Sequence, residues 1–414
     1  MTNSRKQKYD VYLNLPSMGV INAAQAVCVE TDGRLNQFGF RYTPQYLDIA
    51  SAIPFDPLQL PLSNKEFQFR CVGGIPGVLD DYLPDAWGRK VLSYLSFYRD
   101  KKKISHHSCI DSLALMGGSR IGAIQFVSEG NNPLYEFGCE FSQLQKAESA
   151  AQHVDENNIE NADFDELSLL YLANAGTGIG GARPKALIQK NGKAYLAKFN
   201  RLQHDEYNNA RVELACLLMA KEAGINVFGG VIERGINGRE VLLLERFDTC
   251  ANHRHHLITI NALLKSTVTQ SDNNGVFRYD DIANIIRKYS ISVEYDLQQL
   301  LRIMLFNRGI NNTDDHERNF SLINRGEGYQ LAPAYDLVPS LARGAYHIAG
   351  YQHSPSPPYA KEAHALGKIF GLPKTQVKLI ADEVIEAFKS WEKHAEITNV
   401  CEGDQVKLRS IIRA

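Results

Sequence analysis

The chain has 414 residues and a formal net charge of −2 at pH 7, with 44% hydrophobic and 22% charged residues. This length predicts two or three domains, and the composition excludes a wholly disordered chain. The near-neutral charge argues against a protein that mainly coats nucleic acid, although it leaves room for a local basic patch.

No apolar run reaches the length of a transmembrane helix, and the N-terminal stretch lacks the apolar segment of a signal peptide. We therefore expect no membrane association. The seven cysteines are scattered and form no Cys-x-x-Cys pair. This pattern argues against a disulfide framework or a structural zinc site and favours a reducing cytoplasm.

The first part of the chain is predicted to form mainly strands. Residues 8–16 and 24–47 alternate in the manner of strands, with Asp32-Gly33 as a turn. A helical stretch is predicted from Gly77 to about Leu95, a helix end from Asp111 to Leu115, and a short strand from Ile121 to Val127. Residues 128–165 are polar, which predicts a surface excursion between two parts of one lobe.

The rest of the chain turns from strands to helices. Lys190-Asn191-Gly192-Lys193 lies between two apolar runs and predicts a hairpin. A helix is expected over 205–223, with Gly224 at its C-cap, and a buried strand over 241–244. Residues 279–289, 293–309 and 373–394 carry most of the later helical signal. The two halves predict two lobes with a cleft between them.

The most informative stretch is 311–323, which contains Asp-x-x-x-x-Asn from Asp314 to Asn319. Protein kinases use this spacing in the catalytic loop, where the aspartate accepts the proton of the attacking hydroxyl and the asparagine holds magnesium. The spacing alone is a weak signal, because polar loops also produce it by chance. His316 lies inside the stretch and is equally consistent with a catalytic role and a structural one.

The residues that follow strengthen this interpretation. Phe320–Ile323 and Tyr329–Ala332 can pair across a glycine-containing turn, and Asp336 comes soon after. A kinase places its second metal-binding carboxylate at this point. Magnesium takes few protein oxygens and keeps positions for phosphate and water, so Asn319 and Asp336 are expected to hold it while Asp314 faces the acceptor.

A glycine-rich segment at 176–185 matches Gly-x-Gly-x-x-Gly. A helical pattern before it and Pro184 after it argue against a dinucleotide-binding site, and no Walker A sequence is present. Its backbone N–H groups can approach phosphates, and Arg183 and Lys185 add positive charge. A mobile surface loop is the alternative.

Two further positions fit a nucleotide site. Lys198 lies in an apolar strand and needs an anion, and kinases place such a lysine at the α- and β-phosphates with a helix glutamate as its partner. Glu213 is the candidate partner, with a solvent-facing glutamate as the alternative. The segment 244–248 follows a buried strand, so its backbone can contact an adenine.

These four pieces, in this order, resemble the HipA family of bacterial toxin serine/threonine kinases. The matching stretches are 180–188, 195–199, 242–248, and 311–322 with 332–337. Residues 40–47, 77–92 and 121–125 resemble the family's N-terminal subdomain, so the resemblance covers nearly the whole chain.

The resemblance implies an α+β, two-lobed protein-kinase-like fold that uses ATP and Mg²⁺ to phosphorylate a protein serine or threonine. The typical substrate is an aminoacyl-tRNA synthetase, notably the glutamyl enzyme. A HipB-like helix-turn-helix antitoxin is the expected partner, and DNA is reached only through it. We expect an N-terminal subdomain at 1–127, the rest of the N-lobe at 128–248 and a helical C-lobe at 249–414.

The resemblance also assigns roles to single residues. The catalytic residues are Asp314 as base, Lys198 and His316, and the metal ligands are Asn319 and Asp336. The ATP-binding residues are Ile179, Gly180, Gly181, Ala182, Arg183, Lys198, Glu213, Glu245 and Phe247.

One departure from the family pattern concerns the serine that many members autophosphorylate. Gly178 stands at that position, preceded by Thr177. Our hypothesis is that Thr177 replaces this serine poorly or not at all.

Two other functions stay open. One is a regulatory co-repressor module, for which the basic run 99–103 with His106 and His107 offers phosphate contacts, although such a run is more often a solvated face. The other is a small-molecule kinase, because fold alone does not settle function.

Overall fold

The structure is a computed structural model that describes residues 4–71, 74–101, 104–156, 169, 172–173, 175, 183–201, 205–265, 277–342 and 346–413. In it, the N-terminal part of the chain forms an antiparallel sheet. The strands are β1 (Ser4–Leu15), β2 (Gly19–Thr31), β3 (Arg34–Tyr42), β4 (Phe67–Arg70) and β5 (Ile124–Ser128), in the order β4-β3-β2-β1-β5. Asp32 and Gly33 take φ values of 51° and 73° in the predicted turn between β2 and β3.

The strand predicted to reach residue 47 ends at Tyr42 instead. Thr43 caps a short helix, α1 (Pro44–Leu47), by accepting a hydrogen bond from the Tyr46 N–H. Pro44 favours this change because its fixed φ suits the first turn of a helix and it lacks a donor for a strand ladder.

Three helices follow this sheet: α2 (Gly77–Tyr82), α3 (Ala86–Asp100) and α4 (Cys109–Leu115). The single stretch predicted from Gly77 to Leu95 is therefore divided in two. Pro84 disfavours a helical conformation at Leu83, and Asp85 then caps α3 by accepting a hydrogen bond from the Gly88 N–H at 2.7 Å.

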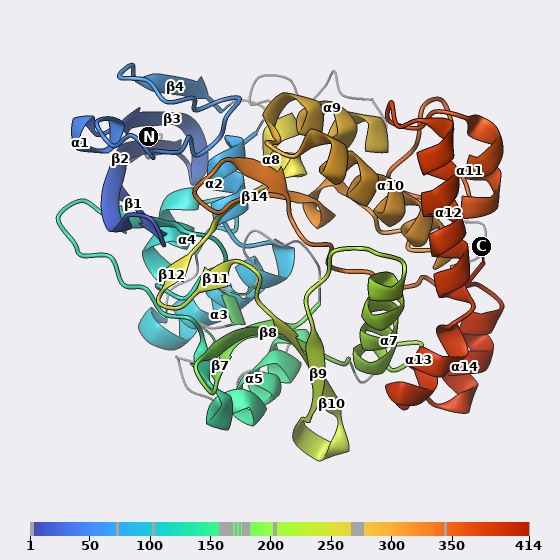
Figure 1. The fold of residues 1–414 in the computed structure, drawn as a ribbon. Helices are drawn as coiled ribbons and strands as arrows, with labels where there is room; N and C mark the ends of the chain where they lie inside the picture. The colour runs from blue at the N-terminus through green and yellow to red at the C-terminus, as the bar shows by residue number, and fades with distance from the viewer. Residues whose placement is uncertain are drawn as a thin grey trace.

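A second sheet has the order β6-β7-β8-β10-β9 and lies apart from the first, with α5 beside β7 and β8 (Figure 1). Its strands are β6 (Cys139–Glu140), β7 (Lys185–Lys190), β8 (Lys193–Phe199), β9 (Gly230–Arg234) and β10 (Glu240–Glu245). Asn191 and Gly192, at φ 51° and 74°, make the predicted hairpin turn between β7 and β8.

The prediction of a surface excursion over 128–165 is confirmed for 129–138, a loop whose residues are intermediate or exposed, but is wrong for 139–156. After the short 3₁₀ turn η1 (Phe141–Gln143), helix α5 (Leu144–Glu156) buries Leu144, Ala147 and Val154 against the second sheet. The sequence did not indicate this packed face, because its alanines are small and alternate with polar residues.

Helix α7 (Asn209–Glu222) supports the same lobe and starts four residues later than predicted, because Asn208 caps it.

The second half of the chain is mainly helical, as predicted, and surrounds a small sheet. The helices are α8 (Ile260–Leu264), α9 (Tyr279–Tyr289), α10 (Val293–Gly309), α11 (Ala360–Leu366), α12 (Lys374–Phe388), α13 (Trp391–Ile397) and α14 (Glu402–Arg409). The helix predicted over 373–394 is broken between α12 and α13. The sheet has the order β13 (His256–Thr259), β14 (Ser321–Asn324) and β15 (Tyr329–Leu331), and β11 (Thr249–Cys250) pairs with β12 (His253–Arg254).

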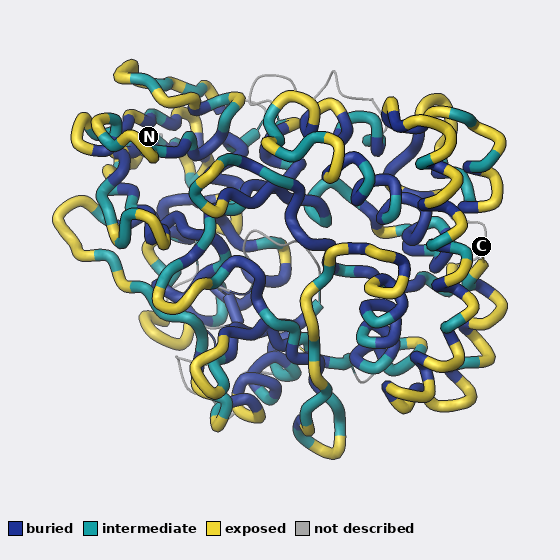
Figure 2. Tube along the Cα trace, viewed as in Figure 1, coloured by how far each residue is buried: buried dark blue, intermediate teal, exposed yellow. Residues whose placement is uncertain are grey.

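The buried residues form three large apolar cores. One lies on the N-terminal sheet, one between the second sheet and α3 and α5, and the largest among the helices of the C-terminal half. Figure 2 shows buried backbone running through the centre of all three parts.

Five of the seven cysteines are buried and free, and Cys250 and Cys401 are exposed and free. No helix in the described ranges is long and apolar enough to cross a membrane.

Candidate active site

Lys198, Glu213 and Asp336 meet at the junction of the two lobes. Lys198 lies on β8, Glu213 on α7, and Asp336 follows β15 by five residues. The Lys198 Nζ is 2.5 Å from Glu213 Oε1, and it also forms an ion pair with Asp336. The sequence placed these residues in separate elements, and the fold brings one ammonium and two carboxylates together.

The three charged groups shift one another's pKa values. Burial raises the pKa of Glu213 and the nearby Asp336 carboxylate adds to the rise, while Lys198 opposes it. Burial also acts to raise the pKa of Asp336, but the ammonium groups of Lys198 and Lys185 outweigh it and the pKa falls. The cluster therefore keeps Asp336 ionised, as a metal ligand must be.

The backbone at Asp336 has an unusual conformation. Its φ is 55°, a left-handed value that side chains other than asparagine and aspartate adopt with difficulty. The Asn312 Nδ2 donates a hydrogen bond at 3.0 Å to the Asp336 carbonyl and so ties this turn to the loop that follows α10. In this conformation the Asp336 carboxylate forms its ion pair with Lys198.

The loop after α10 carries the predicted catalytic base. The Asp314 side chain is 75% exposed and is open to an acceptor. Its pKa is nevertheless raised, because the surrounding protein desolvates it and the carboxylates of Asp336 and Asp315 add repulsion that His316 only partly offsets. A raised pKa makes this carboxylate a stronger proton acceptor than an ordinary aspartate.

Asn319 is oriented within the same loop. Its Nδ2 donates a hydrogen bond to the Asp314 carbonyl at 2.8 Å. Its Oδ1 is buried and has no hydrogen-bond partner among the described residues. An orphaned amide oxygen of this kind is suited to a cation.

His316 lies beside the base rather than in hydrogen-bond contact with it. The His316 Nε2 is 4.0 Å from Asp314 Oδ1, and its Nδ1 accepts a hydrogen bond from the Arg318 N–H at 3.2 Å. This geometry shapes the 3₁₀ turn η3 (Glu317–Asn319) and supports the structural alternative for His316.

A buried network supports the loop from behind, and sequence reasoning missed it. Asp315 is fully buried and accepts hydrogen bonds from the Tyr279 hydroxyl at 2.9 Å and the Ala349 N–H at 3.1 Å, and its Oδ2 lies 3.0 Å from His347 Nδ1. Asn307 donates to the Tyr279 hydroxyl and accepts from Asn312. No local pattern marks these residues, because they come from separate elements.

An apolar pocket opens beside the ion cluster and has a volume of about 550 Å³ including its mouth. The Phe247 ring stacks on Tyr335 with centroids 6.0 Å apart and contacts Phe228 at 5.8 Å. Its walls also include Ile121, Leu196, Leu217, Leu244, Glu245 and Ala334. Sequence reasoning found Glu245 and Phe247 but missed Phe228, Tyr335 and Leu217, although Tyr335 directly precedes Asp336.

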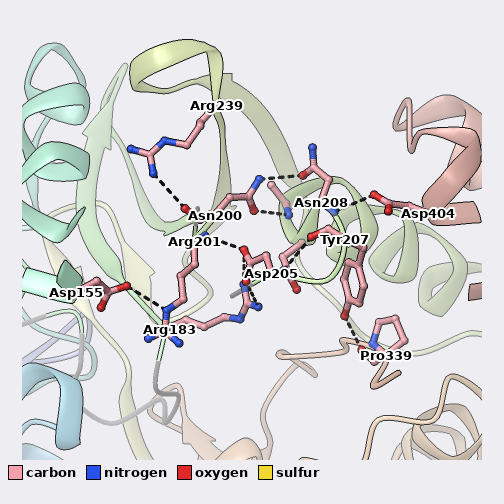
Figure 3. Close-up of polar contacts among 12 residues, drawn as sticks. Asp155, Arg183, Asn200, Arg201, Asp205, Tyr207, Asn208, Arg239, Pro339 and Asp404 are labelled. Atoms are coloured by element: carbon pink, nitrogen blue, oxygen red, sulfur yellow. Dashed lines mark hydrogen bonds and ion pairs between the residues drawn. The ribbon is translucent and has the colours of Figure 1, made fainter. Parts of the chain in front are cut away.

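The predicted phosphate loop is only partly described. Ile179, Gly180, Gly181 and Ala182, and also Thr177 and Gly178, lie outside the described residues. Arg183 is described, and its guanidinium pairs with Asp205 at 2.7 Å (Figure 3). Lys185 is buried, and its ammonium is 3.4 Å from Asp85. Both cations therefore have carboxylate partners in this structure.

Figure 3 also shows how the segment after β8 joins the two lobes. Asp205 accepts a hydrogen bond from the Arg201 N–H at 2.7 Å as well as pairing with Arg183. Tyr207 donates its hydroxyl proton to the Pro339 carbonyl at 2.5 Å, three residues after Asp336. The Asn208 N–H donates to Asp404 on α14 at 2.9 Å.

The residues of the site fit ATP and magnesium. The pocket is apolar where a purine would lie, and the Lys198 ammonium stands where it could meet phosphates. Asn319 Oδ1 and the Asp336 carboxylate are oxygens of the kind that Mg²⁺ prefers. In the described part of the chain no group of three or more His, Cys, Asp or Glu is arranged around a metal position, so a magnesium ion here would take its remaining ligands from phosphate and water.

Comparisons with known protein families agree with this geometry. A model of the HipA-like C-terminal domain matches residues 177–392, and a model of the HipA N-terminal domain matches residues 17–127. A Sinorhizobium fredii protein named Putative kinase Y4mE is 30% identical over 136 residues, which are 31% of this chain and 32% of that protein. The chain thus matches about a third of the length of this curated relative.

The fold is similar to solved structures as well. A chain of the Shewanella oneidensis MR-1 toxin–antitoxin complex of HipA, HipB and operator DNA matches with a TM-score of 0.66 and 18% identity, over 97% of this chain and 94% of that one. The Helicobacter pylori proinflammatory kinase CtkA matches with a TM-score of 0.45 and 15% identity, over 57% of this chain and 88% of that one. The family models and the Shewanella match confirm the two-lobed, mixed α/β, kinase-like fold.

Proposed function

This chain belongs to the HipA family, and from that premise we propose that it is an ATP- and magnesium-dependent kinase that phosphorylates a serine or threonine of a protein. One observation carries the proposal. The Lys198, Glu213 and Asp336 cluster lines one side of an apolar pocket, and Asp314 is exposed nearby. This is the set of groups that phosphoryl transfer needs.

Each group has a distinct task in this mechanism. Phe247, Tyr335 and the other apolar walls hold the purine, and the backbone at Glu245 and Phe247 orients it. Lys198, fixed by Glu213, holds the phosphates. Asn319 and Asp336 would hold the magnesium ion, which when bound neutralises charge on the transferred phosphoryl group.

Asp314 acts on the acceptor rather than on the nucleotide. Its carboxylate accepts the proton of the attacking hydroxyl while the Asn319 amide fixes the Asp314 backbone. Arg183, once released from Asp205, can turn toward the phosphates. We assign Ile179, Gly180, Gly181 and Ala182 to the same task on the basis of the family resemblance.

The family also supports a proposal about the biological role. We propose that the protein is the toxin of a toxin–antitoxin pair in the cytoplasm and stalls translation by phosphorylating an aminoacyl-tRNA synthetase. The similar Shewanella chain comes from a complex with HipB and operator DNA. A HipB-like helix-turn-helix protein is therefore the partner we propose, with DNA bound through it.

The direct test uses two acceptor pools. Purified protein is incubated with radiolabelled ATP and magnesium, first with purified glutamyl-tRNA synthetase and then with a protein-free metabolite fraction. We expect label in the synthetase on serine or threonine. Label only in the metabolite fraction would instead establish the small-molecule kinase, and nucleotide binding without transfer would favour the co-repressor module.

A further inference from the structure

Helix α2 of the N-terminal domain packs directly against α8, beside the catalytic loop. A Cβ on Gly77 would lie 2.2 Å from the Ala262 carbonyl oxygen, so only glycine allows this approach. Both helices are short, and the close contact fixes how the acidic end of α2 meets the C-lobe. The two residues at that end are Asp80 and Asp81.

Asp80 is buried and has three partners in the C-terminal half. Arg318 Nη2 lies 2.5 Å from Asp80 Oδ2, Lys265 Nζ lies 2.8 Å from the same oxygen, and Asn261 Nδ2 donates to it at 3.1 Å. Burial acts to raise the pKa of Asp80, but the charges of Arg318 and Lys265 outweigh it and the pKa is lowered. Asp80 is therefore an ionised anchor.

Asp81 fixes the framework on which this anchor acts. Its carboxyl group accepts hydrogen bonds from the N–H and the hydroxyl of Thr259, at 2.7 and 2.6 Å. Thr259 caps α8 and pairs with Ser321 in the strand that directly follows the catalytic loop. Asp81 thus keeps α2 in register with the end of the loop.

Arg318 links the anchor to the reacting groups. It lies between Asp314 and Asn319 in the loop, and its carbonyl accepts a hydrogen bond from the Tyr335 hydroxyl at 2.9 Å. Within η3, the Asn319 N–H donates to the His316 carbonyl at 2.9 Å. A turn this short has few bonds of its own, so its shape depends on groups outside it.

We propose that Asp80 is a positioning residue for phosphoryl transfer: through Arg318, the N-terminal domain holds the catalytic loop in the geometry that aims Asp314 and Asn319. The N-terminal domain is then part of the catalytic unit and not only a surface for partners. Asp80 itself contacts neither the nucleotide pocket nor the reacting atoms. This inference rests on the proposed kinase function for its catalytic consequence, but not for its effect on the loop.

The test measures loop order and activity separately. Asp80→Asn removes the anionic partner of Arg318, and Asp111→Asn is the matched control, because Asp111 pairs with Arg5 on the outer face of the same domain. Hydrogen exchange of the peptide spanning residues 313–320 reports loop order without any substrate. Transfer to the synthetase and affinity for an ATP analogue report function.

We expect Asp80→Asn to speed exchange in this peptide and to lower the transfer rate about tenfold while the analogue affinity changes less than about twofold. Because Asp80→Asn can also weaken the α2–α8 contact, Arg318→Met is the second variant. It leaves Asp80 paired with Lys265, and we expect the same faster exchange with a smaller loss of thermal stability.

Unchanged exchange in both variants would overturn the proposal. So would equal losses of rate, affinity and melting temperature, because these would show a general structural role. If hydrogen exchange of the peptide 313–320 is faster in the variants but the wild-type protein transfers no phosphate, the effect of Asp80 on the loop is confirmed and the proposed kinase function is wrong.

Discussion

The Lys198 ammonium lies 2.5 Å from the Glu213 carboxylate. Lys198 is on strand β8, and Glu213 is on helix α7, 15 residues further along the chain. The same ammonium is paired with Asp336 from the other lobe. One cation therefore serves two carboxylates, the buried Glu213 and the partly buried Asp336, and removing either carboxylate changes how the lysine is shared. We expect the balance of these three charges to determine whether the proposed nucleotide site can hold phosphates.

Replacing Glu213 by glutamine tests this balance. Glu213→Gln keeps the shape of the side chain but leaves Asp336 as the charged partner of Lys198, so the lysine is drawn toward the metal position. We expect the transfer rate to fall by roughly 10- to 100-fold. Glu222→Gln, on the same helix but paired with Lys393 away from the cleft, is the control and should keep the wild-type rate.

Asn319 should govern the need for magnesium. Asn319→Ala removes the orphaned Oδ1 and the hydrogen bond to the Asp314 carbonyl, so we expect the magnesium concentration for half-maximal rate to rise by about tenfold. Titration of the rate with MgCl₂ measures it. Asn284→Ala, at an exposed position that contacts Arg287, is the control. An unchanged magnesium requirement in Asn319→Ala would remove this residue from the metal site.

Asp81 should make stability depend on pH. Burial raises its pKa from 3.8 to about 7 in the folded protein. The folded chain then holds a proton that the unfolded chain releases, so this stabilising contribution is fully present below the ordinary pKa and is lost as the pH rises through about 7.

Thermal melts between pH 5 and pH 8 check this prediction. Wild-type protein should lose stability across the range, and Asp81→Asn, which cannot titrate, should lose less. Asp111→Asn should follow the wild type. Parallel curves for wild type and Asp81→Asn would show that Asp81 does not titrate in this window.

Thr177 provides a test of self-phosphorylation. Because Gly178 stands where many family members have the modified serine, we expect little phosphate on the loop after incubation with ATP and magnesium. Mass spectrometry of the tryptic peptides measures the occupied sites. Heavy phosphate on Thr177 would show that it replaces the serine after all, and Thr177→Ala would then remove that signal.

The sequence allowed the local elements around the site to be predicted well. Asn191-Gly192 marked its hairpin, and the helices at 279–289 and 293–309 have the predicted bounds. These features depend on residues close in sequence. The helix α5 was missed because its buried face consists largely of alanines, which are apolar but weak in any hydrophobic pattern.

The long-range part of the site could be predicted only where a motif carried it. Kinase-like spacing pointed to Lys198, Glu213 and Asp336, which the fold brings together. Nothing in the sequence pointed to Asp80 beside Arg318, which is 238 positions away, or to His347 beside Asp315. The first contact depends on how the N-terminal domain docks on the C-lobe and the second on how two C-lobe loops pack together, and neither leaves a periodic pattern in the chain.

The most direct test of the central claim separates chemistry from binding at Asp314. Wild-type protein, Asp314→Asn and the control Asp280→Asn are compared for phosphate transfer from ATP to glutamyl-tRNA synthetase and for affinity toward an ATP analogue. Asp280 is on the outer end of α9 and accepts a hydrogen bond from the Gln352 N–H. We predict that Asp314→Asn loses at least about 100-fold in rate with nearly unchanged affinity. Full transfer by Asp314→Asn would contradict the proposed mechanism.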